Sequence, residues 1–271
     1  MLRPRIIPCL LVHNSGLVKT VRFKEPKYVG DPINAVKIFN EKETDELIVL
    51  DIDAAAQCRE PNFKLIAQLA VECRMPLCYG GGVKNVEQAR KIIGLGVEKV
   101  ALSSAAIDNP ALISQIAAEV GSQSVVVVLD VKASSSAKRY EVWTHNASRN
   151  SGRSALDVAG EAERLGAGEI VVNSIDNDGQ MKGYDLTLAQ QIRRATRLPM
   201  TVLGGAGSLA DIGKLIGACG VVGAAAGSLF VFKGSYRAVL INYPNPTQKE
   251  DLLQAALKAS PACGPDGLTR P

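Results

Sequence analysis

Eight short apolar runs alternate with amphipathic stretches along almost the whole of this 271-residue chain. Each run is nearly continuously apolar, as expected for a parallel strand whose outer face is covered by a helix. The runs span residues 5–12, 46–51, 76–80, 99–102, 124–130, 169–173, 200–203 and 221–226, and the amphipathic stretches span residues 31–43, 61–71, 85–95, 110–120, 155–165, 186–195 and 209–216. Eight strands that alternate with helices predict an α/β protein with a (β/α)8 (TIM) barrel rather than a doubly wound sheet.

The predicted barrel occupies residues 1–250, in agreement with the length of about 250 residues that this fold typically needs. Asp31-Pro32 and Asn109-Pro110 each place an N-cap residue before a proline at the first helical position, so we expect a helix to begin at each. Residues 251–271 contain one or two amphipathic turns and then a segment rich in proline and glycine. We expect them to form a C-terminal tail that is partly disordered.

An internal repeat divides the chain into two similar halves. The matching segments are 76–82 (PLCYGGG) with 199–205 (PMTVLGG), 48–51 (IVLD) with 170–173 (IVVN), and Ser104 with Ser228. The second match makes Asp51 the equivalent of Asn173. The repeat therefore predicts a barrel built from two (β/α)4 halves, with a pseudo-twofold site at its mouth, the carboxyl-terminal end of the strands.

Each half supplies glycines after its third strand and small residues with a serine after its fourth. Glycine lets backbone N–H groups approach an anion, and the dipole of a following helix favours negative charge. The predicted phosphate-binding residues are Gly81, Gly82, Ser103 and Ser104 in the first half and Gly204, Gly205, Gly227 and Ser228 in the second. Two facing sites imply an elongated ligand with a phosphate at each end, although tight turns alone would also explain the glycines.

A basic loop follows the first strand and contains Lys19, Arg22, Lys24 and Lys27. Lys19 is a candidate to close over the phosphates, and a solvated charged loop is the alternative.

Asp130 ends the fifth strand, a position that points into the mouth of a barrel and is typical of a catalytic residue. A carboxylate there can act as a general acid or base, or it can cap the following turn. The repeat places Leu11 at the equivalent position in the first half, so a pair of catalytic carboxylates is incomplete.

Charged residues stand at the beginnings of four strands, on the face opposite the mouth: Arg5, Glu46, Lys99 and Glu169. Charges near a barrel axis must pair to offset their desolvation, so we expect a closed ring of salt bridges. The residues by themselves favour a plug that stabilises the bottom of the barrel, because residues on that face usually serve stability.

Composition excludes several classes of function. The net charge of +4 is small and evenly spread, which argues against nucleic-acid binding, and no apolar stretch is long enough to span a membrane. Six cysteines without a C-x-x-C pair and two histidines make a metal site improbable. We expect a cytoplasmic protein with reduced thiols, no metal and no cofactor.

From Arg5 to about Phe232 the chain resembles the cyclase subunit of imidazole glycerol phosphate synthase. The most specific segments are 30–32 (GDP), 45–47 (DEL), 79–82 (YGGG), 121–126 (GSQSVV), 174–179 (SIDNDG), 183–185 (GYD) and 204–207 (GGAG). In that family a glutaminase docks at the amino-terminal face of the barrel, and its ammonia crosses the interior to attack a bisphosphorylated ribulosyl-formimino substrate at the mouth. The family's ammonia gate matches all four residues of the predicted ring, so the resemblance favours a gate over a plug.

One departure from the family bears on activity. The family uses two catalytic aspartates, of which Asp130 matches the second, whereas Leu11 replaces the first. Leucine cannot ionise, and loss of a general acid or base costs about 10²–10⁴ in rate. The resemblance thus implies retained phosphate sites and impaired cyclase chemistry.

Residues 10–32 and 237–244 are similar to a branch of paralogues associated with surface-polysaccharide biosynthesis. In that branch a sugar amidotransferase uses the ammonia to convert an N-acetyl group on a nucleotide-linked sugar to an acetamidino group. The chain is then an ammonia-conducting partner of a glutaminase. The alternatives are an active cyclase of histidine biosynthesis that uses Asp53 or Asp178 as its second carboxylate, and a phosphate-sensing barrel that switches the glutaminase without conducting ammonia.

Overall fold

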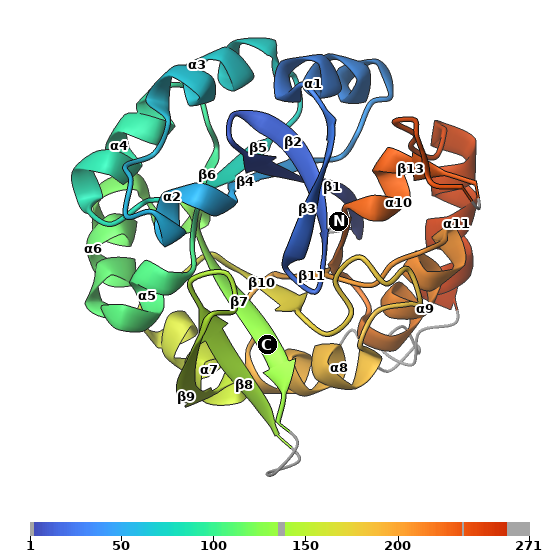
Figure 1. Ribbon diagram of the computed structural model, residues 1–271. Helices are drawn as coiled ribbons and strands as arrows, with labels where there is room; N and C mark the ends of the chain where they lie inside the picture. Colours follow the sequence, from blue (N-terminus) through green and yellow to red (C-terminus); the bar gives the residue numbers. More distant parts are fainter. Residues whose placement is uncertain (1–2, 135–138, 235, 259–271) are drawn as a thin grey trace.

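The computed structural model describes residues 3–134, 139–234 and 236–258, and it shows a closed barrel of eight parallel strands (Figure 1). The barrel strands, in chain order, are β1 (Arg5–His13), β4 (Leu47–Asp51), β5 (Leu77–Gly80), β6 (Lys99–Leu102), β7 (Val125–Ala133), β10 (Glu169–Ser174), β11 (Met200–Leu203) and β12 (Gly223–Ala226). Pairing of β12 with β1 and of β10 with β7 closes the sheet on itself. The predicted (β/α)8 barrel is confirmed.

Helices surround the barrel and cover the outer face of the sheet (Figure 1). They are α1 (Pro32–Glu41), α3 (Phe63–Glu72), α4 (Val86–Gly94), α6 (Ala111–Val120), α7 (Ala155–Arg164), α8 (Leu186–Ala195) and α9 (Leu209–Cys219). Each of these helices was predicted from the amphipathic pattern, and their ends differ from the prediction by at most a few residues. The core between helices and sheet consists of aliphatic side chains such as Ile66 and Ile92, which are fully buried.

The two predicted helix starts have different outcomes. Asp31 caps α1, since its side chain accepts a hydrogen bond from the Asn34 amide and Pro32 is the first helical residue. Asn109 does not cap the N-terminus of a helix, and that prediction was wrong: it is the C-cap of the short helix α5 (Ser104–Asp108), with its amide donating to the Ala105 carbonyl. Pro110 therefore precedes α6 without a capping side chain.

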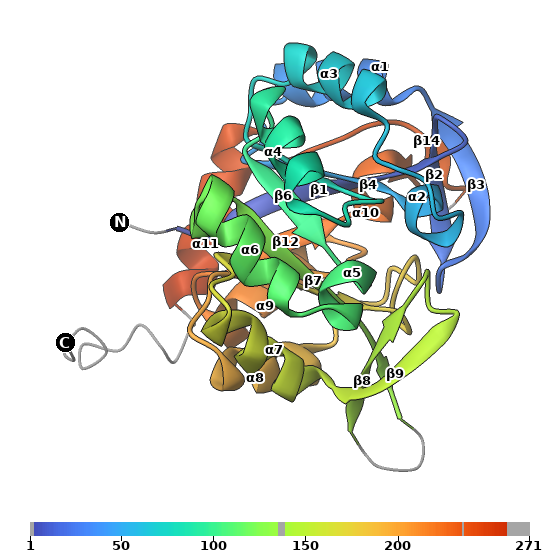
Figure 2. The ribbon, with the colours of Figure 1, turned by 90° about the vertical axis from the view of Figure 1, so that its left-hand side faces the viewer.

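Two β-hairpins that the sequence did not predict extend from the mouth. Hairpin β2 (Gly16–Val21) and β3 (Lys24–Gly30) follows β1, and hairpin β8 (Tyr140–Thr144) and β9 (Arg149–Ser154) follows β7. Figure 2 shows both hairpins and the short helices α2 (Ile52–Ala56), α5 and α10 (Ser228–Val231) at one end of the barrel, opposite the N-terminus. The hairpins follow the first strand of each half, as expected for two similar half-barrels.

The strand register corrects one match within the repeat. Leu11 pairs with Leu50 in the first half, and Asp130 pairs with Asn173 in the second. The equivalent of Asn173 is therefore Leu50 and not Asp51. Asp51 is the next residue of β4, so its side chain leaves the strand on the other face. It also borders the cavity at the mouth, and its side chain caps α2 by accepting hydrogen bonds from the amides of Asp53 and Ala54.

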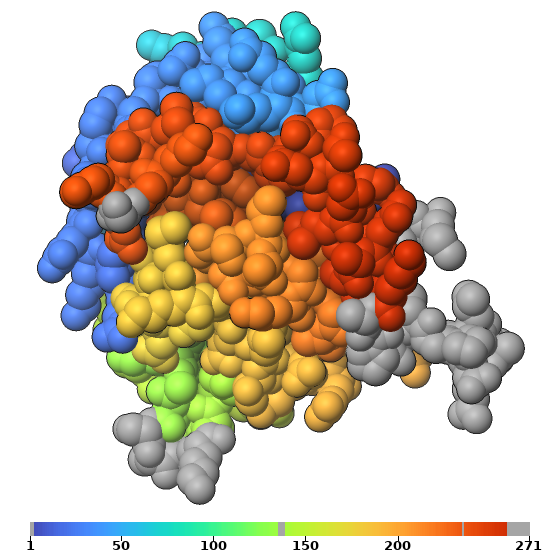
Figure 3. Space-filling view, turned by 90° about the vertical axis from the view of Figure 1, so that its right-hand side faces the viewer, coloured from blue at the N-terminus to red at the C-terminus, as the bar shows by residue number. Residues whose placement is uncertain are grey.

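The C-terminal part packs against the side of the barrel. After the small hairpin β13 (Phe232–Lys233) and β14 (Ala238–Val239), helix α11 (Pro246–Lys258) lies on α9, and Figure 3 shows it on the surface in red. Leu253 and Ala256 of α11 are buried, so the helix extends across position 250, where we expected a tail to begin. Residues 259–271 of that predicted tail lie outside the described residues.

No helix in the described part of the chain has both the length and the hydropathy of a membrane span.

Candidate functional site

A cavity of about 390 Å³ opens at the mouth of the barrel. Eight of its lining residues form one layer, which we call the mouth layer, with one residue from the carboxyl end of each barrel strand. In chain order they are Leu11, Leu50, Gly80, Ser103, Asp130, Asn173, Leu203 and Gly227, of which Ser103 and Gly227 directly follow β6 and β12. The register pairs Leu11 with Leu50 and Leu50 with Gly80 in the first half, and Asp130 with Asn173 and Asn173 with Leu203 in the second. Polar side chains come from three consecutive strands (β6, β7 and β10), and leucines come from β11, β1 and β4. The cavity therefore has a polar side and an apolar side.

Asp130 is the centre of the polar side. Its two carboxylate oxygens accept one hydrogen bond each, from Asn173 Nδ2 at 2.9 Å and from Ser103 Oγ at 3.1 Å. Burial raises the pKa of Asp130 more than these two hydrogen bonds lower it, and the carboxylate of Asp178 adds to the increase. The resulting pKa is about 6. A carboxyl group with such a pKa can donate or accept a proton near neutral pH.

Asn173 was missed by the sequence analysis as a site residue. It is 4% exposed, and its Oδ1 has no hydrogen-bond partner in the part of the chain that the structure describes. The available signal was its place as the first polar residue after the apolar residues 170–172 of β10. The offset error in the repeat matched it to Asp51, which faces the other way.

The pKa of Asp130 has a consequence for stability. Because burial raises its pKa from the ordinary value of 3.8 to about 6, the carboxylate is less stable in the folded protein than in the unfolded chain. The free energy of unfolding should therefore fall by up to about 3 kcal/mol as the pH rises from about 4 to about 6, at 1.36 kcal/mol per pKa unit. Above pH 6 this contribution should stay level. Asp130→Asn should remove this loss, so urea unfolding should find the variant more stable than the wild type at pH 7 but not at pH 4.

Asp108→Asn is the matched control, because Asp108 lies at the cavity rim with a side chain that is 44% exposed. It should have little effect at either pH. An Asp130→Asn variant with the same pH dependence as the wild type would show that Asp130 has an ordinary pKa.

The apolar side of the cavity contains the residue that replaces a second carboxylate. Leu11 and Leu50 pair in the first half at the positions that Asp130 and Asn173 occupy in the second. The first half thus lacks both the acid and the amide that orients it. In the mouth layer, leucines therefore replace one of the two carboxylates of the predicted acid–base pair and the amide that would orient it, whereas Asp130 and Asn173 are retained in the second half.

The predicted phosphate residues all line the cavity, on opposite sides of the mouth. Gly81, Gly82, Gly204 and Gly205 have positive φ, and a Cβ at any of them would lie within 3 Å of a neighbouring backbone oxygen. Turn packing is therefore sufficient to require glycine at these four positions. Phosphate binding by them stays a prediction.

The serines of the two halves differ in their contacts. Ser103 donates to Asp130, and Ser104 Oγ accepts a hydrogen bond from the His145 amide. In the second half, Ser228 begins α10 and is buried, and neither α5 nor α10 has a capping side chain at its N-terminus.

Lys19 differs from the other basic residues of its loop. It is buried, and its Nζ donates to the Cys9 carbonyl at 2.6 Å. A Cβ at Gly227 would lie 2.7 Å from that Nζ, so glycine at this position leaves room for the amine. Burial lowers the pKa of Lys19. The amine lies beside the predicted second phosphate site, whereas Arg22, Lys24 and Lys27 are exposed.

The two alternative carboxylates lie in different places. Asp178 lines the cavity and accepts hydrogen bonds from Thr20 Oγ1 at 2.7 Å and from the Phe23 amide at 3.1 Å. Asp53 is outside the cavity lining and contacts His13 Nδ1 at 2.6 Å. Of the two, only Asp178 is placed to reach a ligand in the mouth.

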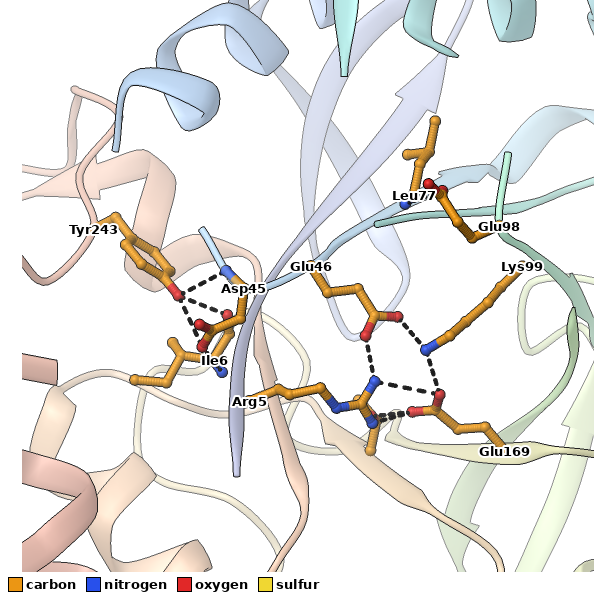
Figure 4. Close-up of polar contacts among 10 residues, drawn as sticks. Arg5, Ile6, Asp45, Glu46, Leu77, Glu98, Lys99, Glu169 and Tyr243 are labelled. Atoms are coloured by element: carbon orange, nitrogen blue, oxygen red, sulfur yellow. Dashed lines mark hydrogen bonds and ion pairs between the residues drawn. The ribbon is translucent and has the colours of Figure 1, made fainter. Parts of the chain in front are cut away.

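At the opposite end of the barrel, Arg5, Glu46, Lys99 and Glu169 form a closed ring of ion pairs, the charged ring (Figure 4). Lys99 Nζ lies 2.7 Å from both Glu46 Oε1 and Glu169 Oε2. Arg5 Nη1 pairs with Glu46, and Arg5 Nη2 lies 2.7 Å from Glu169 Oε1. Burial alone would raise the pKa of Glu169, but the two cations outweigh it and hold that pKa at about 2. The predicted pairing is confirmed, and the Glu169 carboxylate stays ionised at neutral pH.

An apolar layer separates the charged ring from the cavity. It consists of inward-facing strand residues that are buried and do not line the cavity: Ile7, Ile48, Cys78, Val126, Val171 and Ala225. Along the barrel axis the order is therefore charged ring, apolar layer and open mouth. Within residues 3–134, 139–234 and 236–258, no group of three or more His, Cys, Asp or Glu side chains could hold a metal ion.

Comparison with known proteins places this architecture in a family. The family described as "Histidine biosynthesis protein" matches residues 5–237. The chain belongs to this family. It is 56% identical to a Leptospira borgpetersenii protein over 252 residues, which cover 93% of this chain and 99% of the relative. A Pseudomonas aeruginosa protein is 54% identical over 245 residues, covering 90% of this chain and 97% of that protein.

Both relatives carry provisional names, as imidazole glycerol phosphate synthase subunits HisF and hisF2. A Lactococcus lactis protein that is named imidazole glycerol phosphate synthase subunit HisF without that qualification is 42% identical over 212 residues, covering 78% of this chain and 82% of its own length. This member of the histidine biosynthesis family is thus a HisF-like barrel, with greater similarity to the provisionally named paralogues than to the L. lactis subunit.

Proposed function

We propose that this barrel receives ammonia from a glutaminase docked at its amino-terminal face and conducts it to the mouth, with little cyclase activity of its own. The observation that carries the proposal is a complete charged ring at one end of a barrel whose mouth has Leu11 in place of a second catalytic carboxylate. The names of the relatives support assembly with another protein, because each is named as a subunit.

The charged ring supports a role as an ammonia gate. The side chains of Arg5 and Lys99 are 26% and 18% exposed, whereas those of Glu46 and Glu169 are 4% and 6% exposed. The cations are thus accessible from the amino-terminal face, where a glutaminase would dock. Beyond the ring, the apolar layer favours uncharged ammonia over ammonium, because an unpaired charge is costly to bury.

The mouth supports a role as a delivery site. The predicted phosphate residues on both sides of the cavity, with Lys19, would hold a phosphorylated ligand. By the resemblance of residues 10–32, the acceptor of the ammonia is a sugar amidotransferase that acts on an N-acetylated nucleotide sugar in the cytoplasm, for surface-polysaccharide biosynthesis.

A direct assay tests the proposal. The chain, purified with its glutaminase, should hydrolyse glutamine to glutamate but should not form imidazole glycerol phosphate from the ribulosyl-formimino substrate, with either glutamine or ammonium chloride as nitrogen source. Product formed at an ordinary enzymatic rate, about 1 s⁻¹ or faster, would contradict the loss of cyclase activity.

A second candidate is an active cyclase in which Asp178 replaces the missing carboxylate. Its place in the cavity lining and its raised pKa, caused by burial, favour it over Asp53. If this candidate is correct, the assay gives product, and both Asp178→Asn and Asp130→Asn abolish it.

A further inference from the structure

The charged ring has a further polar contact, the hydroxyl of Thr201. Thr201 lies on β11 and is fully buried. Its Oγ1 lies 2.6 Å from Glu169 Oε1 and 3.4 Å from Arg5 Nη2. Because a carboxylate can only accept and a guanidinium can only donate, the hydroxyl donates its proton to Glu169 and accepts from Arg5. It therefore bridges the two partners of one ion pair of the ring.

The strand positions show that this hydroxyl reaches the ring from the barrel interior. Alternate residues of a strand share a face, and Leu203, two residues after Thr201, lines the mouth cavity. Thr201 therefore also faces inward. It pairs with Gly223 of β12 and with Val171 of β10, a residue of the apolar layer. A Cβ at Gly223 would overlap the Thr201 hydroxyl, so glycine on the neighbouring strand leaves the space that the hydroxyl needs.

The contacts of the two glutamates of the ring differ. Glu169 contacts both cations of the ring and Thr201. Among the residues that the structure describes, the side chain of Glu46 contacts the two cations alone. The internal repeat matches Thr201 with Cys78, a residue of the apolar layer. The second half of the barrel thus places a hydroxyl beneath the ring where the first half has a thiol.

We propose that Thr201 is a positioning residue of the charged ring, whose hydroxyl holds the Glu169 carboxylate against Arg5. The terminal torsion of a glutamate is broad, so the ion pairs alone would leave the carboxylate free to turn. A hydrogen bond to a charged group shifts such an equilibrium about tenfold or more. A carboxylate oxygen that turned into the axis would attract ammonium and retain nitrogen at the entrance. This consequence rests on the proposed function, in which the ring is an ammonia gate.

Two variants separate the hydroxyl from the volume of the side chain. Thr201→Val keeps the shape and removes the hydroxyl, whereas Thr201→Ser keeps the hydroxyl on a smaller side chain. In the full chain alone at pH 7, the carboxylate carbon resonance of Glu169 should shift in Thr201→Val and stay near its wild-type position in Thr201→Ser. Thr201→Ala, which also lacks the hydroxyl, replaces Thr201→Val if the valine variant does not fold.

The second measurement uses the complex of the chain with its glutaminase and the sugar amidotransferase. Thr201→Val should raise the fraction of glutamine nitrogen that escapes to solution severalfold, and Thr201→Ser should restore the wild-type fraction. Thr196→Val is the matched control, because Thr196 is also buried and its hydroxyl donates to a glutamate, Glu163, at 2.7 Å. That pair joins α7 to the end of α8, outside the barrel lumen. The control should keep the wild-type fraction.

Three results would overturn the proposal: a folded Thr201→Val variant with the wild-type Glu169 resonance or the wild-type escape fraction, a Thr201→Ser variant that behaves like Thr201→Val, or an equal effect of Thr196→Val. The second would assign the effect to packing, and the third to a general loss of stability. If Lys99→Met uncouples the complex and Thr201→Val does not, only this inference fails. If neither variant uncouples it, ammonia conduction through the ring fails as well.

Discussion

Leu11→Asp should give this barrel measurable cyclase activity. Leu11 lines the cavity, at the position in the first half that Asp130 occupies in the second. An aspartate there would supply the missing acid or base, and such a group contributes about 10²–10⁴ in rate. We therefore expect imidazole glycerol phosphate formation with ammonium chloride to rise by at least about 10² over the wild type, which should be close to the uncatalysed rate.

Leu11→Asn is the matched control, because asparagine has nearly the same shape and polarity as aspartate but cannot ionise. This variant should remain inactive. The new carboxylate would lie beside Leu50, without the amide that Asn173 gives Asp130. The double variant Leu11→Asp with Leu50→Asn should therefore be more active than the single variant. If a folded double variant is inactive, the loss of cyclase activity has a cause beyond these two positions.

Much of the fold could be predicted from the sequence, because parallel strands buried on both faces are apolar throughout and the helices between them are amphipathic. The charged ring could also be predicted, since a charge at the start of such a strand needs a partner. The hairpin β2–β3 could not, because β3 (Lys24–Gly30) is largely exposed and polar and has no alternating pattern. The length of helix α11 was underestimated as one or two turns, because only two of its residues, Leu253 and Ala256, are buried and the amphipathic pattern is weak.

The polar side of the mouth was only half predicted. Asp130 was found because it ends the apolar run of residues 124–130, although β7 itself continues to Ala133. Asn173 was missed because the spacing between repeats cannot fix the strand register to one residue, and a shift of one residue moves a side chain to the other face of the sheet. Asp51 was matched to it for this reason, although the two face in opposite directions. Pairing partners, which only the structure gives, identified Leu50 as the equivalent residue.

Lys99→Ala should uncouple glutamine hydrolysis from use of the ammonia and should destabilise the barrel. Lys99 Nζ bonds to both carboxylates of the charged ring at 2.7 Å, so without it Glu46 and Glu169 share only Arg5. Removing one partner of a buried ion pair costs about 3–5 kcal/mol, and the partial exposure of Lys99 places the expected loss at the lower end. Urea unfolding measures the loss of stability. In the complex, the fraction of glutamine nitrogen that escapes to solution should rise severalfold.

Lys99→Met keeps most of the apolar volume of the side chain, so it replaces Lys99→Ala in the coupling measurement if the alanine variant does not fold. Lys214→Ala, at an exposed position on α9, is the control and should change neither quantity. A folded Lys99→Met variant with unchanged coupling would favour a barrel that senses phosphorylated ligands and switches its glutaminase without conducting ammonia. The distinction holds because the charged ring closes the entrance to the barrel axis, and ammonia must pass this entrance in a conduit but not in a sensor.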